Sequence, residues 1–374
     1  MFSIVSRQSV SSPNHAKLNA KKRENNSMTI NELFKFTVKS NASDLHLVSG
    51  LKPVVRLHGE LKEITKATVL TPKATQDMIF ELLSREQEER FMKEKELDFA
   101  YQITSGERFR INIFFEKDAM SLAARFIPSK IPTMEELEMP QVAYDLVHMP
   151  HGLILVTGPT GSGKSTTMAS MIDSINKEES NNIITLEDPI EFLFKPIKSI
   201  IRQRQVGTDS LSFAEGLKHM LRQDPDVIMV GEMRDLETIA TTLTLAETGH
   251  LVFATLHTWS AAQTIDRIID VFPPHQQIQI KLQLAMTLRG ILSQQLLPKI
   301  GGGRTAAREI LLNTPAVANL IRENKVQQIN TVIQTGAKLG MVSLEQDLKR
   351  LIKEKKITEE TADAYTVSLK QAAG

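Results

Sequence analysis

Apolar and polar positions follow different patterns in the two parts of the chain. Between residues 28 and 130, mixed segments such as VVRLHGEL at 54–61 and FRINIFF at 109–115 are typical of strands. Thr71 and Pro72 are typical of the N-cap and first position of a helix, and Ser84 with Gln87 is a capping-box pair. The pattern predicts a small α+β domain over residues 28–130.

From Gly152 onward, short apolar runs alternate with longer helical segments. The runs are LILVT at 153–157, IITL at 183–186, VIMV at 227–230 and HLVFAT at 250–255. They do not alternate with polar residues, as expected for parallel strands that are buried on both faces. The sequence predicts an α/β domain over residues 151–374 that becomes mostly helical beyond Pro273 and Pro274.

Two segments are predicted to lie outside these domains. Pro128, Pro132 and Pro140 interrupt the helical and strand periodicity and predict a linker over residues 131–150. Residues 1–27 are rich in Ser, Asn and Lys, have few apolar residues to bury, and predict a disordered extension or an upstream start. A basic arm for a membrane or nucleic acid is the alternative for residues 1–27.

Composition narrows the functional classes. A chain of 374 residues exceeds the roughly 250–300 residues at which one core stops growing, so two domains are expected. The absence of cysteine excludes disulfides, thiolate zinc sites and a cysteine nucleophile. No apolar run approaches the roughly 20 residues that a membrane span needs, so we expect a cytoplasmic protein with peripheral membrane contact only.

The distribution of charge argues against a nucleic-acid motor. Residues 1–27 carry five Lys and Arg against one Glu, whereas the rest of the chain carries 40 basic and 43 acidic residues. A protein that grips nucleic acid usually has a surplus of basic residues to neutralise phosphates. No nucleic-acid partner is therefore expected.

A glycine-rich loop follows the run LILVT and precedes a helical segment. The sequence GPTGSGKS fits the pattern G-x-x-x-x-G-K-[ST] in its strand–loop–helix context, where backbone N–H groups surround phosphate oxygens. The lysine should reach the β- and γ-phosphates of ATP, and Ser165 should bind Mg²⁺. The predicted nucleotide-binding residues are Gly158, Pro159, Thr160, Gly161, Ser162, Gly163, Lys164, Ser165 and Thr166.

Glu232 is the candidate catalytic carboxylate. It ends the apolar run 227–230 and so lies at the carboxyl edge of the predicted sheet, where ligands of open α/β sheets bind. There it could polarise the attacking water as a general base. Gly231 occupies the place where many P-loop proteins have a Mg²⁺-binding Asp, so Mg²⁺ is assigned mainly to Ser165, the phosphates and water.

Three further residues follow or begin predicted strands. Glu191, in EDPIE after the run IITL, could order Mg²⁺-bound water or the attacking water; a solvated turn is the alternative. His257 follows HLVFAT and could sense the γ-phosphate, while His250 begins the same run. From the residues alone, a structural role is favoured for both histidines.

Four long motifs occur in a fixed order in the second domain. They are GPTGSGKS at 158–165, LEDPIEF at 186–192, LRQDPDVIMVGEMRD at 221–235 and TGHLVFATLHT at 248–258. Together they closely resemble the type II/IV secretion ATPase superfamily, and within it the retraction ATPases of type IV pili, the PilT family. The resemblance runs from about Met28 to the 350s and includes ASDLHL at 42–47 and RFRIN at 108–112.

The resemblance implies a homohexamer in which each subunit has an N-terminal PAS-like domain and a RecA-like P-loop ATPase domain with a helical C-terminal part. It implies Walker A roles for Lys164 and Ser165, a Walker B role for Glu232, an "Asp box" role for Glu191, and "His box" roles for His250 and His257. It also implies that Arg108, Arg110 and Arg125 close over nucleotide at a subunit boundary. Mobile guanidinium groups there would couple hydrolysis to domain movement.

Two features bear on whether such an ATPase would assemble pili or retract them. Assembly and type II secretion ATPases of the superfamily commonly carry a tetracysteine zinc motif, which this chain lacks. The family's AIRNLIRE motif, tied to retraction, is present at 316–323, with Val317 in place of Ile and Ala318 in place of Arg. The resemblance therefore implies a motor of pilus retraction and twitching motility that docks on an inner-membrane platform protein.

Other functions stay open at this point. They are an accessory PilU-like ATPase that works with paralogous pilus ATPases, an assembly or type II secretion ATPase, and a non-catalytic subunit that binds ATP. A DNA motor is the competing class, and the low aromatic content of 5% argues against it.

Overall fold

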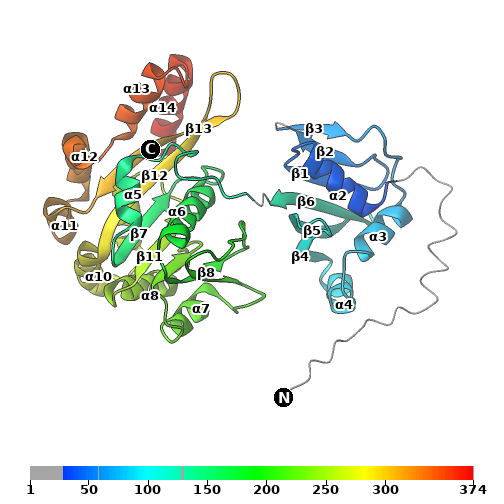
Figure 1. Cartoon of the computed structure of the whole chain (residues 1–374), viewed down its shortest axis with the longest axis horizontal. Helices are drawn as coiled ribbons and strands as arrows, with labels where there is room; N and C mark the ends of the chain where they lie inside the picture. The colour runs from blue at the N-terminus through cyan, green and yellow to red at the C-terminus, as the bar shows by residue number, and fades with distance from the viewer. Residues whose placement is uncertain (1–27, 58, 128–129, 374) are drawn as a thin grey trace. The chain divides into compact units, whose positions relative to one another are not determined.

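The computed structural model describes residues 28–57, 59–127 and 130–373, and divides the chain into two units at Ser129 and Lys130 (Figure 1). The predicted extension over residues 1–27 lies outside the described residues.

The first unit is an antiparallel sheet covered by helices on one face. Its sheet order is β3-β2-β1-β6-β5-β4. Its elements are α2 (Ile30–Lys39), β1 (Asp44–Leu47), β2 (Val54–Leu57), β3 (Glu60–Glu63), α3 (Pro72–Phe80), α4 (Arg85–Glu94), β4 (Glu96–Gln102), β5 (Arg108–Glu116) and β6 (Ala119–Ile127). In β5, Phe109, Ile111 and Ile113 are buried in the core with Leu33 and Phe34 of α2, so the residues between them face the other way.

The local signals in this unit are confirmed, with one change. Thr71 accepts a hydrogen bond from the Ala74 N–H with Pro72 at the first helical position, and Ser84 with Gln87 forms the capping box. The predicted strand VVRLHGEL is instead two strands, β2 and β3. The chain reverses near Gly59, whose φ of 90° is open to glycine without strain.

The second unit is built on a seven-stranded sheet of order β13-β12-β7-β11-β10-β8-β9, in which only β13 is antiparallel to its neighbour. The strands are β7 (Gly152–Thr157), β8 (Asn182–Glu187), β9 (Ile200–Gln205), β10 (Val227–Val230), β11 (Leu251–Leu256), β12 (Leu288–Pro298) and β13 (Arg304–Leu312). All four apolar runs named from the sequence form strands of this sheet.

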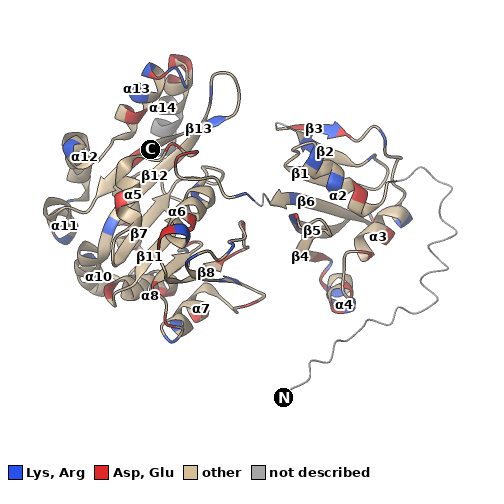
Figure 2. Cartoon of the chain, in the orientation of Figure 1, with Lys and Arg blue, Asp and Glu red and all other residues tan. Residues whose placement is uncertain are grey.

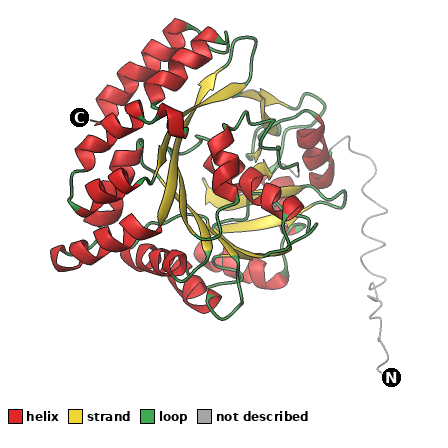
Figure 3. Ribbon diagram, turned by 60° about the vertical axis from the view of Figure 1, so that its left-hand side comes forward, coloured by secondary structure: helices red, strands yellow, loops and turns green. Residues whose placement is uncertain are grey.

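Helices cover both faces of this sheet (Figure 3). They are α5 (Gln141–Val147), α6 (Lys164–Glu178), α7 (Phe213–Met220), α8 (Leu236–Glu247), α9 (Ala261–Asp270), α10 (Pro274–Thr287), α11 (Pro315–Arg322), α12 (Ile329–Thr335), α13 (Leu344–Lys353) and α14 (Glu359–Ala373). Leu153 and Leu155 of β7 pack toward α8, α9 and α10, whereas Ile154 and Val156 pack toward α5 and α6. Burial on both faces explains why these strands are apolar throughout.

Residues 131–150, predicted as a linker, belong to the packed second unit. Met134 and Met139 are 2% and 8% exposed and lie in the same core cluster as Val147 of α5. Pro140 is the N-cap residue of α5 and therefore starts a helix instead of marking a free segment. The structure replaces most of the predicted linker with a segment packed on the sheet.

The region beyond Pro274 is mostly helical, as predicted, but it also adds two strands to the sheet. It contains β12 and β13, a long hairpin that extends the sheet, joined by a turn in which Gly301, Gly302 and Gly303 all have positive φ. Helices α13 and α14 pack on this hairpin through Leu348, Leu351 and neighbouring apolar residues. Among the described residues, no helix is long and apolar enough to span a membrane.

Candidate nucleotide site

The glycine-rich loop lies between the end of β7 and the start of α6. Gly158, Gly161 and Gly163 have φ values of 144°, 79° and 88°, which side chains larger than glycine rarely adopt. In the described structure no side chain caps the N-terminus of α6, so its first N–H groups are available to an anion. The remaining predicted loop residues, Pro159, Thr160, Ser162, Ser165 and Thr166, are brought together here by the chain itself.

Lys164 fits a phosphate ligand. It is 8% exposed, and its Nζ donates to the carbonyl oxygens of Gly158 and Pro159 at 2.9 and 3.0 Å. Burial lowers the pKa of Lys164, and the charges of Glu191 and Glu232 oppose that shift. A buried ammonium whose hydrogen-bond partners are neutral loop carbonyls is suited to exchange them for phosphate oxygens.

Glu232 lies at the same edge of the sheet as the loop. It follows β10 and is 8% exposed; its Oε1 is 2.6 Å from an Nη of Arg234, and its Oε2 is 3.5 Å from Nε2 of His257. The backbone of Leu186 and Glu187 lies close to Gly231, so the Asp of other P-loop proteins would be tightly packed at this position. A Cβ there would lie 3.2 Å from the Leu186 carbonyl oxygen.

Two acids lie at and just beyond the end of β8, in different environments. Glu187 is 6% exposed, accepts hydrogen bonds from Thr185 Oγ1 at 2.7 Å and Gln203 Nε2 at 3.1 Å, and has a pKa raised by burial. Glu191 is exposed, and its N–H donates to Glu187 at 3.4 Å. Glu187 therefore holds the turn, while Glu191 is free to reach solvent near Lys164.

The two predicted histidines lie at opposite edges of the sheet. His257 follows β11 and contacts Glu232; burial and then the Lys164 charge lower its pKa, and the Glu232 charge raises it. His250 precedes β11, where its Nδ1 lies 2.9 Å from the Leu245 carbonyl oxygen. Since β11 runs parallel to β7, its six residues separate His250 from the loop edge by roughly 20 Å. One copy of the chain does not bring His250 to the nucleotide site.

The three predicted arginines share one face of the first unit's sheet. Arg110 is directly opposite Arg125, and Arg108 lies two residues away on the same face of β5. Arg125 Nε donates to Asp44 Oδ1 at 2.9 Å, and Arg56 Nε lies 3.7 Å from Asp44 Oδ2. Arg108, Arg110 and Arg125 belong to the first unit, whereas the P-loop belongs to the second unit. The fold of the first unit therefore does not by itself bring these arginines to the P-loop.

Several residues of the site were missed from the sequence. Arg234 lies inside a quoted motif, but nothing local indicates that it pairs with Glu232. Gln294 of β12 contacts the loop at Ser162, 132 positions away, and carries no sequence signal that separates it from other glutamines. The Gln294 contact depends on the order of strands in the sheet, whereas Arg234 and Glu232 lie two residues apart in the sequence.

Comparison with known proteins shows the family of the chain. The family model for type II/IV secretion system proteins matches residues 20–372. The chain is 48% identical over 335 residues to the type IV pilus retractation ATPase PilT of Pseudomonas aeruginosa, covering 90% of this chain and 97% of that protein. It is 45% identical over 311 residues to a twitching motility protein of Neisseria gonorrhoeae, covering 83% of each.

A solved structure extends the similarity to the fold. The crystal structure of the pilus retraction motor PilT with bound ADP matches at a TM-score of 0.85 and 48% identity, covering 90% of this chain and 96% of that chain. Together with the P-loop and the buried acid at the same sheet edge, this supports nucleotide binding. The chain therefore belongs to the type II/IV secretion system protein family and is an ATPase of its PilT branch, the motors of pilus retraction.

Proposed function

We propose that the chain is the subunit of a homohexameric motor that hydrolyses ATP at residues 158–166 and uses the energy to retract type IV pili. The observation that carries this proposal is the placement of Glu232. This acid is 8% exposed, lies at the same sheet edge as Lys164, and contacts a histidine and an arginine. A largely buried carboxylate beside a phosphate site can orient the attacking water and accept its proton.

The loop residues bind and orient the nucleotide. Backbone N–H groups of the glycine-rich loop and of α6 bind phosphate oxygens, and Lys164 exchanges its two carbonyl contacts for the β- and γ-phosphates. Ser165 and water ordered by Glu191 would hold Mg²⁺. When bound, Mg²⁺ would neutralise negative charge on the phosphates while the γ-phosphoryl group is transferred to water.

His257 and Arg234 position Glu232. The ring of His257 is half-exposed and burial lowers its pKa, so a neutral imidazole can donate its one N–H either to the Glu232 carboxylate or to a phosphate oxygen. We assign His250 no role at its own chain's P-loop, since it lies at the opposite edge of the sheet.

The first unit would complete the site in the hexamer. We assign it a PAS-like fold over residues 28–130, with Arg108, Arg110 and Arg125 closing over phosphate bound to a neighbouring subunit. The 2.9 Å contact of Arg125 with Asp44 supports this assignment, because it orients a largely exposed guanidinium on the open face of the sheet. The hexamer would dock peripherally on an inner-membrane platform protein at the cytoplasmic face.

Purified protein tests the catalytic assignment. Lys164→Ala should abolish ATP binding, and Glu232→Gln should bind ATP but lose about 10²–10⁴-fold in kcat. Glu237→Gln is the matched control, since Glu237 is an exposed acid on α8 that pairs with Lys218. Rapid turnover by Glu232→Gln would refute the assigned base, and wild-type protein that binds ATP without hydrolysing it would indicate a non-catalytic subunit.

The amount of pilin on the surface of the native host tests whether the motor retracts pili or assembles them. A strain carrying only Glu232→Gln should accumulate pili that do not retract. Loss of pili would indicate an assembly motor, and unchanged pili would indicate an accessory paralogue. Lys and Arg are interspersed with Asp and Glu on both units (Figure 2), which supports the expectation that DNA does not stimulate hydrolysis.

A further inference from the structure

Gln294 lies directly beneath the glycine-rich loop. Strand β12 runs alongside β7 to the pair Ser293–Thr157 and then continues past the end of β7, so Gln294 is level with the loop. It is 2% exposed; its Nε2 donates to the Ser162 carbonyl oxygen at 2.8 Å, and its Oε1 accepts from Thr167 Oγ1 at 2.9 Å. One buried amide therefore joins the loop to the first turn of α6.

The loop glycines are fitted to the same residue. A Cβ on Gly158 would lie 2.3 Å from the backbone oxygen of Gln294, and a Cβ on Gly163 would lie 3.2 Å from its Nε2. The loop backbone thus rests on β12 with no space between them. Displacement of Gln294 would deform the surface that binds phosphate.

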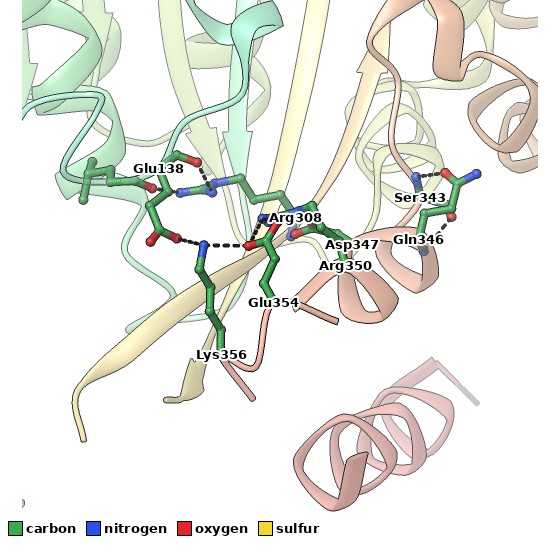
Figure 4. Close-up of polar contacts among 9 residues, drawn as sticks. Glu138, Arg308, Ser343, Gln346, Asp347, Arg350, Glu354 and Lys356 are labelled. Atoms are coloured by element: carbon green, nitrogen blue, oxygen red, sulfur yellow. Dashed lines mark hydrogen bonds and ion pairs between the residues drawn. The ribbon is translucent and has the colours of Figure 1, made fainter. Parts of the chain in front are cut away.

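Arg308 is the cross-strand neighbour of Gln294 on β13 and projects from the same face of the sheet. It is 5% exposed, and its guanidinium donates to the carbonyl oxygens of Leu137 at 2.8 Å and Glu138 at 3.2 Å. Its backbone N–H donates to Asp347 of α13 at 2.8 Å (Figure 4). Arg308 therefore joins β13 both to α13 and to the segment 134–139, which lies near the start of the second unit.

Burying the charge of Arg308 costs folding free energy, which these contacts offset only in part. Burial lowers the pKa of Arg308, and its Nε has no partner among the described residues. Glu138 holds a φ of 51°, a conformation that is uncommon for a residue with a side chain. A fully buried cation that lacks one hydrogen bond is weak support for a purely stabilising role.

We propose that Gln294 is a positioning residue for the nucleotide loop, and that the pair Gln294–Arg308 couples occupancy of this loop to the segment 134–139. The inference rests on the proposed nucleotide site at residues 158–166. It identifies a route, through two buried side chains on adjacent strands, from the phosphate-binding backbone to the segment that leads into the second unit.

Binding of a fluorescent ATP analogue to the full-length protein tests the positioning role. Gln294→Met removes both hydrogen bonds at nearly constant volume and should raise Kd about tenfold or more, because the Ser162 oxygen is left buried and unpaired. KM should rise in parallel while kcat at saturating ATP changes by less than about threefold, since Glu232 is untouched. Loss of folded protein alone would not produce this split between KM and kcat.

Gln295→Met is the matched control. Gln295 is the next residue of β12, is 6% exposed and faces the other side of the sheet, and its Nε2 has no hydrogen-bond partner in the part of the chain that the structure describes. Its Kd should stay within about twofold of wild type. Equal Kd values for the two variants would overturn the role of Gln294, whereas ATP binding that survives Lys164→Ala would instead refute the proposed nucleotide site.

Hydrogen exchange tests the coupling. Saturating ATP should slow exchange at the amides of Glu138 and Met139, which bond within the segment 134–139 in the described structure. This protection should persist in Gln295→Met and be lost in Gln294→Met at saturating ATP. Protection that is absent in wild type, or that persists in Gln294→Met, would contradict the coupling.

Discussion

Replacing Asp347 with alanine tests how strongly α13 is held to the hairpin beneath it. Asp347 is 5% exposed; its Oδ2 accepts the Arg308 N–H at 2.8 Å, and its Oδ1 accepts from Arg350 Nε at 2.7 Å (Figure 4). The substitution leaves a buried N–H without an acceptor and removes a carboxylate whose charge stabilises the buried Arg308.

The size of the effect follows from these two losses. An unsatisfied buried N–H costs about 1–3 kcal/mol, and the ion pair of Asp347 with Arg350, whose side chain is 40% exposed, adds up to about 1 kcal/mol. The two terms overlap, and Arg350 keeps its contacts with Glu354. We therefore expect a total loss of about 2–4 kcal/mol for Asp347→Ala, and a smaller loss for Asp347→Asn, which keeps an acceptor for the N–H.

Glu345→Ala is the control on the same helix. Glu345 pairs with Lys349 at 2.6 Å, but both side chains are about 70% exposed, so the pair should contribute less than about 0.5 kcal/mol. Native-state hydrogen exchange of the α13 amides measures the opening free energy of this element in each variant. A difference below about 1 kcal/mol between Asp347→Ala and Glu345→Ala would refute the reasoning.

Three further outcomes are expected. Glu232→Gln should lower the pKa of His257 further, because burial and the Lys164 charge already lower it and only the Glu232 carboxylate opposes them; a rise seen by NMR titration of the ring would contradict the contact. Burial raises the pKa of Glu309, so the folded protein binds a proton at this carboxylate more tightly than the unfolded chain does. The wild type should therefore lose stability relative to Glu309→Gln as pH rises from the unfolded value of about 4.3 through the folded pKa, and equal urea midpoints across that range would count against this. Gly158→Ala should abolish ATP binding while α13 keeps its hydrogen-exchange protection, because its Cβ would lie 2.3 Å from a β12 carbonyl; near-normal affinity would show that the loop is less constrained than described.

Local signals allowed much of the fold to be predicted. The caps at Thr71 and Ser84, and the apolar runs at 153–157 and 227–230, formed the helices and strands expected of them. These features depend on neighbours within about four residues or on burial of both strand faces. The predictions at 54–61 and 131–150 differed from the structure because a turn at Gly59 and burial of Met134 were not decided by periodicity.

The sequence by itself determined the glycine-rich loop, the strand that precedes it and the helix that follows it, because residues 153–178 are contiguous and their geometry is local. Tertiary structure decided which distant residues join that loop. The order of the strands brings Glu232 and His257 together and puts Gln294 under the phosphate-binding backbone. No pattern within a window of one helix or strand contains that order, since it arises from packing between segments up to 132 residues apart.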